Sequence, residues 1–202
     1  MTGKIKTSTG APDADAATVR TFQEGAKDAF DELVLKHKDK VFNLCYWFIG
    51  DYEEANDSAQ EIFVKVYRSL EKFRFESTFF TWLYRIAVNT CKNRIKSSEY
   101  RQKKKMVWLD NPGKQQSGNT SCDIRDESPS PIVELERKER LMFIKKAINS
   151  LPAEQKIVVA LRDIEGLSYE EVASITGFNL GTVKSRLARA RLNLREKLRG
   201  VI

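Results

Sequence analysis

The chain has 202 residues, of which 41% are hydrophobic and 31% are charged, and its formal net charge is +7 at pH 7. This length allows one large domain or two small ones, and the apolar fraction is sufficient for packed cores, which excludes wholesale disorder. A basic chain is expected to have a polyanionic partner, either nucleic acid or an acidic membrane surface.

The spacing of the cysteines and the presence of a single histidine exclude several classes of protein. Cys45, Cys91 and Cys122 lie far apart, none belongs to a CxxC pair, and His37 stands among lysines, where we expect a solvated face. A disulfide framework and a Cys/His zinc site are therefore not expected, and neither is a bound metal or cofactor. The N-terminal residues lack an apolar h-region and no run of about 18 apolar residues occurs, so we expect a cytoplasmic protein with no secretory signal and no direct membrane insertion.

The first half of the chain predicts a helical domain. Residues 1–20 are polar and are predicted to form a flexible N-terminal tail. Apolar residues at helical spacing begin at Phe30 and stop at Gly50-Asp51, where a second amphipathic helix begins. A third helix is expected from about Thr78 to Lys96. Residues 21–105 therefore predict a first helical domain without strands.

The composition then changes between about Met106 and Val133, where three of the five prolines lie among Gly, Ser, Asn and Gln. This segment predicts a flexible linker over residues 106–133. Residues 134–202 predict a second domain, with helices near residues 134–150, 153–164, 169–176 and 180–198. The predicted fold class is all-α, with two small helical domains joined by the linker.

The last two predicted helices have the pattern of a helix-turn-helix. Ala173 supplies a small residue where two helices cross, Gly177 accepts the positive φ of the turn, and Val183 buries an aliphatic side chain. Ser168 and Glu171 have the spacing of a capping box. The outward face of the second helix can enter a major groove, although a solvated basic helix that closes a small bundle is the structural alternative. The predicted duplex-binding residues on this face are Thr182, Lys184, Ser185, Arg186 and Arg189.

Three segments of the first domain have a different chemistry. Residues 51–61 contain five acids and no base, residues 73–85 are rich in aromatic side chains, and residues 92–105 contain seven bases and one acid. Acids near a helix N-terminus favour its dipole, and they can also meet a basic surface of another protein. Aromatic rings can stack on unpaired bases, although rings at helical spacing also fit a core. The basic run can track phosphates.

Two segments of the first domain resemble the sigma-2 domain of extracytoplasmic-function sigma factors of the sigma-70 family: DYEEANDSAQEIF from Asp51 and FTWLYRIAVNT from Phe80. Three segments of the second domain resemble the sigma-4 domain of the same family: SLPAEQ from Ser150, GLSYEEVA from Gly166 and GTVKSRLARAR from Gly181. The resemblance covers about residues 26–198 apart from the linker. It implies a protein that binds core RNA polymerase, directs it to specific promoters and promotes strand opening.

The resemblance also implies roles for particular residues. Asp57, Gln60 and Glu61 would bind core polymerase at the clamp region of the beta-prime subunit. The helix-turn-helix would read the minus-thirty-five element as duplex DNA. The loop from Arg74 to Phe79 and the helix after it would hold the minus-ten element on the non-template single strand. The residues implied for this strand are Arg74, Phe75, Glu76, Ser77, Thr78, Phe79, Thr81, Trp82, Arg85, Asn89 and Lys92. Because many members of the family are held inactive by an anti-sigma factor, such a partner is also expected.

Two other functions fit parts of the sequence. A stand-alone helix-turn-helix regulator with an N-terminal interaction domain would explain the second domain, but the first domain lacks a pocket-forming pattern or a phosphoacceptor context. An enzyme acting on DNA, such as a recombinase, would need a nucleophile in a charged cluster or paired metal carboxylates. No Ser, Tyr or Cys has such a setting, so we expect no catalytic residue and no enzyme.

Overall fold

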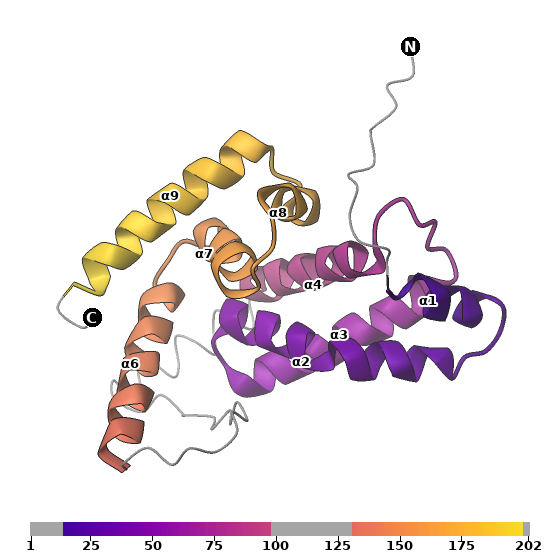
Figure 1. Cartoon of the computed structure of the whole chain (residues 1–202), viewed down its shortest axis with the longest axis horizontal. Helices are drawn as coiled ribbons and strands as arrows, with labels where there is room; N and C mark the ends of the chain where they lie inside the picture. The colour runs from indigo at the N-terminus through magenta and orange to yellow at the C-terminus, as the bar shows by residue number, and fades with distance from the viewer. Residues whose placement is uncertain (1–13, 98–130, 200–202) are drawn as a thin grey trace.

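The computed structural model describes residues 14–97 and 131–199, and every regular element in these two ranges is a helix (Figure 1). The all-α prediction is therefore confirmed. The predicted linker lies outside the described residues, except for its last three residues, which begin the first helix after it.

The first domain contains four helices whose ends follow local signals in the sequence. Gly50 adopts a left-handed conformation (φ 84°) that ends one helix, and the Asp51 side chain caps the next by accepting from Glu54 N at 2.9 Å. Thr78 caps the last of the four by accepting from Thr81 N at 3.2 Å. The helices are α1 (Ala16–Gln23), α2 (Ala29–Ile49), α3 (Tyr52–Leu70) and α4 (Phe79–Lys96).

Helix α1 begins inside the segment that was predicted to be a tail. Val19 and Phe22 lie three residues apart on one face of α1 and are buried in the core of the first domain. Two large apolar residues in eight are a weak periodic signal, which explains why the sequence alone did not indicate this helix. The ordered domain therefore extends to residues before 21, and the predicted boundary at residue 20 is corrected.

His37 is buried, which corrects the expectation that it lies on a solvated face. Its Nε2 lies 2.9 Å from Asp15 Oδ2, and its ring packs 5.6 Å from the ring of Phe79. Lys36, which also pairs with Asp15, remains half-exposed. A helix places consecutive residues about 100° apart, so exposed lysines beside His37 do not determine which face the histidine occupies.

We expect His37 to make the stability of the fold depend on pH. Burial lowers the pKa of His37 below its usual 6.5, against the opposing effect of the Asp15 carboxylate, while Lys36 and Lys40 lower it further. The unfolded chain therefore takes up this proton before the folded chain does, so the free energy of unfolding decreases as the pH falls below about 6.5. Above about pH 6.5, His37 does not change the free energy of unfolding with pH.

Urea unfolding followed by circular dichroism between about pH 7.5 and 5.5 measures this slope. The control is His37→Gln, which keeps an N–H donor toward Asp15 and carries no titrating group in this range. The variant should lose part of the pH dependence. Equal slopes in both proteins would assign the proton uptake to other groups.

The second domain contains α6 (Pro131–Asn149), α7 (Ala153–Val159), a π-helical turn η1 (Ala160–Ile164), α8 (Tyr169–Thr176) and α9 (Leu180–Lys197). The capping box is confirmed, because Ser168 Oγ accepts from Glu171 N and the Glu171 carboxylate accepts from Ser168 N. Gly177 has φ 74°, as the helix-turn-helix requires, and Val183 is fully buried. The helix predicted over residues 153–164 is α-helical only as far as Val159.

The two domains pack against each other around one continuous apolar core. The buried Lys156 of α7 donates to the Phe48 carbonyl at 3.2 Å and to Asn149 Oδ1 at 3.1 Å. The last carbonyls of α2 have no donor within the helix, and a cation is favourable at a helix C-terminus, so Lys156 acts as a cap supplied by the other domain. The buried Tyr84 hydroxyl of α4 donates to Glu165 Oε2 at 3.0 Å.

Candidate nucleic-acid interface

The N-terminal half of α9 presents most of the side chains predicted to bind duplex DNA. Asn179 caps the helix by accepting from Thr182 N at 2.7 Å. Burial of Val183 and Leu187 on the inner face leaves Lys184 exposed on the outer face. Ser185 and Arg189 are also exposed, and Thr182 is half-buried. This face has the mixed hydroxyl and cationic chemistry that suits base edges and phosphates.

Arg186 differs from its predicted neighbours because its guanidinium is held within the second domain. Its Cζ lies 3.9 Å from the centroid of the Phe178 ring, and its Nη2 lies 2.6 Å from Glu154 Oε2. Its Nη1 is buried and has no hydrogen-bond partner among the described residues. The sequence prediction grouped Arg186 with the outward face, but the side chain turns back toward α7 and the turn before α9.

An aromatic surface lies in the loop between α3 and α4, residues 71–78, and in the first turns of α4. Phe73 is buried, and its ring centroid lies 4.9 Å from that of Phe75 and 5.0 Å from that of Trp82. Phe75 and Trp82 are each half-buried, so each exposes part of a ring. The predicted polar residues lie around them, with Arg74, Glu76 and Thr78 exposed and Ser77 half-buried. This surface can offer aromatic faces to unpaired bases.

Phe79 and Thr81, which were predicted to contact DNA, are buried within the described fold. Phe79 is 0% exposed, and its ring packs beside those of His37 and Trp82. Thr81 is 7% exposed, and its hydroxyl lies 2.9 Å from that of Thr78. Phe80, the next residue of α4, is only half-buried.

Three further predicted residues lie along α4, and two of them contact the helix-turn-helix. Arg85 donates from Nε to the Ser174 carbonyl at 2.8 Å and from Nη2 to Ser174 Oγ at 2.7 Å. The ammonium of Lys92 lies 5.2 Å from the centroid of the Phe178 ring, and burial lowers the pKa of this lysine. Asn89 is exposed. Ser174 and Phe178 were not predicted, because no sequence signal links residues so far apart.

The predicted polymerase-binding residues share the exposed side of α3. Asp57, Gln60 and Glu61 are all exposed, and Glu61 pairs with Lys65 one turn later at 2.6 Å. Glu54, in the first turn of the same helix, is buried and accepts from Arg94 Nε at 2.6 Å. The acidic surface of α3, defined here as Asp57, Gln60 and Glu61, is therefore separate from the acid that holds α3 to α4.

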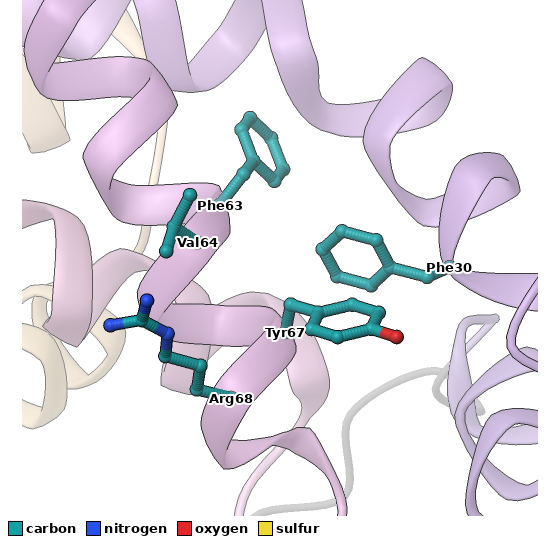
Figure 2. Close-up of a pocket in the computed structure, with 5 residues that line it drawn as sticks. All are labelled: Phe30, Phe63, Val64, Tyr67 and Arg68. Carbon is teal, nitrogen blue, oxygen red and sulfur yellow. The ribbon is translucent and has the colours of Figure 1, made fainter.

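A hollow of about 380 Å³ lies on α3 beyond the acidic surface and is lined by Phe30, Phe63, Val64, Tyr67 and Arg68. The rings of Phe30, Phe63 and Tyr67 converge there from α2 and α3 (Figure 2). Val64 is 48% exposed and Tyr67 is 43% exposed, which is high for large apolar side chains. Their spacing of three residues on the outer face of α3 is the signal from which this hollow could have been predicted.

Within residues 14–97 and 131–199, no group of three or more His, Cys, Asp or Glu side chains is placed to hold a metal ion. None of the helices in the described part of the chain is both long and apolar enough to cross a membrane.

Comparison with known proteins places both domains in one family. The family model described as sigma-70 region 2 matches residues 33–101, and the model described as sigma-70, region 4 matches residues 141–194. The RNA polymerase sigma-H factor of Pseudomonas aeruginosa is 40% identical over 177 residues, which cover 88% of this chain and 90% of that protein. The ECF RNA polymerase sigma-E factor of Escherichia coli K12 is 36% identical over 188 residues, which cover 93% and 96%.

Two solved structures resemble the whole described fold. CnrH in complex with the cytosolic domain of CnrY has a TM-score of 0.65 and 23% identity, and the match covers 92% of this chain and 97% of that one. The sigma factor RpoE in complex with the anti-sigma factor NepR from Bartonella quintana has a TM-score of 0.60 and 26% identity, with coverage of 85% and 97%. At 23% identity, the likeness to CnrH shows a shared fold alone.

Proposed function

Because this chain belongs to the extracytoplasmic-function sigma factors of the sigma-70 family, it is an RNA polymerase sigma factor, and we propose how its surfaces divide promoter recognition between them. The acidic surface of α3 binds core polymerase, α9 reads the minus-thirty-five element as duplex, and the aromatic loop holds the minus-ten element as a single strand. No reaction is assigned to the chain, and it acts in the cytoplasm, where polymerase works.

The observation that carries this proposal is the separation of acidic and basic surfaces in one chain. Asp57, Gln60 and Glu61 lie together on α3, where an anionic surface repels DNA but suits a basic surface of another protein. The hollow beside Val64 and Tyr67 adds exposed apolar area on the same helix (Figure 2). Charged and apolar patches that adjoin are typical of protein interfaces. We therefore assign this side of α3 to the clamp region of the polymerase beta-prime subunit.

The DNA-binding surfaces fit two different forms of DNA. Lys184, Ser185 and Arg189 form an exposed helix face that suits a major groove. Phe75 and Trp82 offer partly exposed rings, which can stack only on bases that have left the duplex. Strand opening by polymerase supplies such bases. This order of events explains why one sigma factor needs both kinds of surface.

Contact between the domains bears on how the minus-ten surface becomes available. Arg85 and Lys92 face Ser174 and Phe178 of the helix-turn-helix, so their use in promoter binding requires the second domain to move away from α4. Polymerase, by binding the two domains separately, would supply that separation. RpoE of Bartonella quintana, which this chain resembles, is in complex with an anti-sigma factor, and we propose a partner of this kind here as well.

Reconstitution with core RNA polymerase tests the proposed function. The full chain is mixed with core polymerase, and the complex is isolated and used to transcribe a library of genomic fragments from the source organism. The proposal requires a stable complex and transcription from a discrete set of fragments. Sequence-specific binding to duplex by the chain alone, with no capture of polymerase, would instead favour a stand-alone helix-turn-helix regulator.

We expect Arg189→Ala to weaken recognition of the upstream promoter element selectively. Arg189 is exposed on the outer face of α9, where an arginine that is bidentate to a guanine contributes about 1–3 kcal/mol of discrimination. Binding of the complex with polymerase is compared on duplexes selected from a random pool and on scrambled duplexes. The matched control is Arg191→Ala, because Arg191 is already paired with Asp163. A loss by Arg189→Ala that is equal on both duplexes would reassign Arg189 to a phosphate.

A further inference from the structure

Helix α1 lies against the aromatic loop, although it precedes the matched region 2, residues 33–101. In Figure 1 α1 lies at the end of the molecule away from α7, α8 and α9. The packing between the two domains therefore leaves this end of the first domain open. The surface formed by α1 and the aromatic loop is therefore not covered by the second domain.

Gln23, the last residue of α1, holds the start of this loop. Its Nε2 donates to the Leu70 carbonyl at 3.0 Å and to the Phe73 carbonyl at 2.9 Å. The Leu70 carbonyl, at the end of α3, also accepts from Phe73 N at 3.1 Å, so Gln23 adds a second donor to it. Lys27, just after α1, also pairs with Glu71. One amide thus connects the end of α3 to the residue from which the aromatic surface begins.

The conformation that this bracing maintains is unusual. Phe75 has φ 57°, and it is the one residue other than glycine with positive φ among the described residues. A bulky residue adopts the left-handed region only where its surroundings hold it there. The Phe73 ring on one side and the fixed Phe73 carbonyl provide such surroundings. The orientation of the exposed part of the Phe75 ring is therefore fixed by these contacts before any strand binds.

Arg20 lies one turn before Gln23 on the same side of α1. Its guanidinium carbon is 5.3 Å from the centroid of the Phe75 ring. The side chain is exposed, and it makes no ion pair within the described residues. A guanidinium beside an aromatic face can stay on the ring while it donates two parallel hydrogen bonds to a phosphate. A base stacked on Phe75 brings its own backbone phosphates to this neighbourhood.

We propose that α1 is part of the single-strand site, in which Arg20 binds a backbone phosphate of the unpaired strand and Gln23 is a positioning residue that holds the loop. This inference rests on the proposed function of the aromatic loop. Arg20 adds affinity that does not depend on base identity, and Phe75 supplies the stacking surface. The site is therefore completed by a helix outside the matched region.

Binding of the full chain to a fluorescein-labelled (dT)20 single strand, measured by anisotropy at several salt concentrations, tests the proposal. Each phosphate contact in a single strand contributes about 0.7 to the slope of log K against log salt. Arg20→Ala should weaken binding roughly three- to tenfold and reduce that slope by about 0.7. Arg20→Lys should restore the slope. Arg140→Ala, which removes an exposed arginine from α6, is the matched control and should change both quantities less.

Gln23→Ala separates positioning from direct contact. It should weaken binding of (dT)20 at a temperature where the variant is fully folded, and it should leave the salt slope unchanged because no phosphate contact is removed. Unchanged affinity of the folded Gln23→Ala variant would reduce Gln23 to a structural role. Arg20→Ala that behaves like Arg140→Ala, or that weakens binding of a 20-base-pair duplex to the same extent, would overturn the assignment of Arg20.

Phe75→Ala distinguishes failure of this inference from failure of the proposed function. If Phe75→Ala weakens binding of (dT)20 and Arg20→Ala does not, the loop is a single-strand site to which α1 contributes nothing. If Phe75→Ala binds (dT)20 as tightly as the unmodified chain does, the loop is not such a site, and the role proposed for it fails together with this one.

Discussion

Reversing the charge at Asp57 and Glu61 together, as Asp57→Arg with Glu61→Arg, should abolish capture of core polymerase and transcription by the reconstituted complex. Both side chains are exposed on α3, so the substitutions change the charge of a surface and leave the core intact. Like charges brought together at an interface cost several kcal/mol, which is roughly a thousandfold in affinity. Within the chain, the substitutions break the ion pair between Glu61 and Lys65, which is exposed and contributes little to stability.

The readouts for this double variant are polymerase pull-down, transcription and thermal unfolding. A control with the same change in net charge is Asp39→Arg with Glu196→Arg, which reverses two exposed acids outside α3. The control should retain pull-down, and both variants should unfold near the temperature of the unmodified chain. If the α3 variant still captures polymerase and transcribes, the acids serve only the helix dipole, and the stand-alone regulator becomes the better hypothesis.

Phe79→Ala should destabilise the first domain by about 3–5 kcal/mol, whereas Phe75→Ala should have a much smaller effect on stability. Phe79 is fully buried between α2 and α4, and removing its ring leaves a cavity beside His37 and Trp82. Phe75 is half-buried, so its truncation removes less buried area. The same chemical change thus separates a core ring from a surface ring four residues away.

Urea unfolding measures the stability of both variants, and (dT)20 binding measures their second property. Phe79→Ala, studied at low temperature where it is folded, should bind the single strand with little change. Phe75→Ala should bind it more weakly while remaining nearly as stable as the unmodified chain. The reverse pattern, with Phe79 critical for binding and Phe75 for stability, would contradict the placement of the two rings.

Local signals made much of the fold predictable. The N-terminal ends of α3, α4 and α8 could be predicted from Asp51, Thr78 and Ser168. A short polar side chain at these positions accepts from N–H groups that the first turn of a helix leaves free. Gly50 and Gly177 mark the positions where only a residue without a Cβ adopts the required conformation without strain. These rules act within a few residues, so a single sequence contains all the information that they need.

The errors concern contacts between distant parts of the chain. Phe79 is fully buried at the start of α4 and Phe80 is half-buried, although both rings pack near His37 of α2, so contacts with other helices decide which ring enters the core. Arg186 turns inward because Glu154 and Phe178 lie beside it, which the pattern of its own helix does not indicate. The clearest omission is α1, whose role depends on a loop that begins about 50 residues later.

The cap that Lys156 places on the end of α2 limits how freely the two domains can be exchanged between relatives. A chimaera that takes residues 141–194 from another sigma factor keeps the Phe48 carbonyl and the Tyr84 hydroxyl but receives new partners for them. If the incoming module lacks a lysine at position 156 and a carboxylate at position 165, two polar groups lose their partners in a buried setting, at a cost of about 1–3 kcal/mol each. The segments matched by the family models are therefore not the units in which this protein can be recombined. A chimaera that keeps its stability must take the residues on both sides of the contact between the two domains from the same parent.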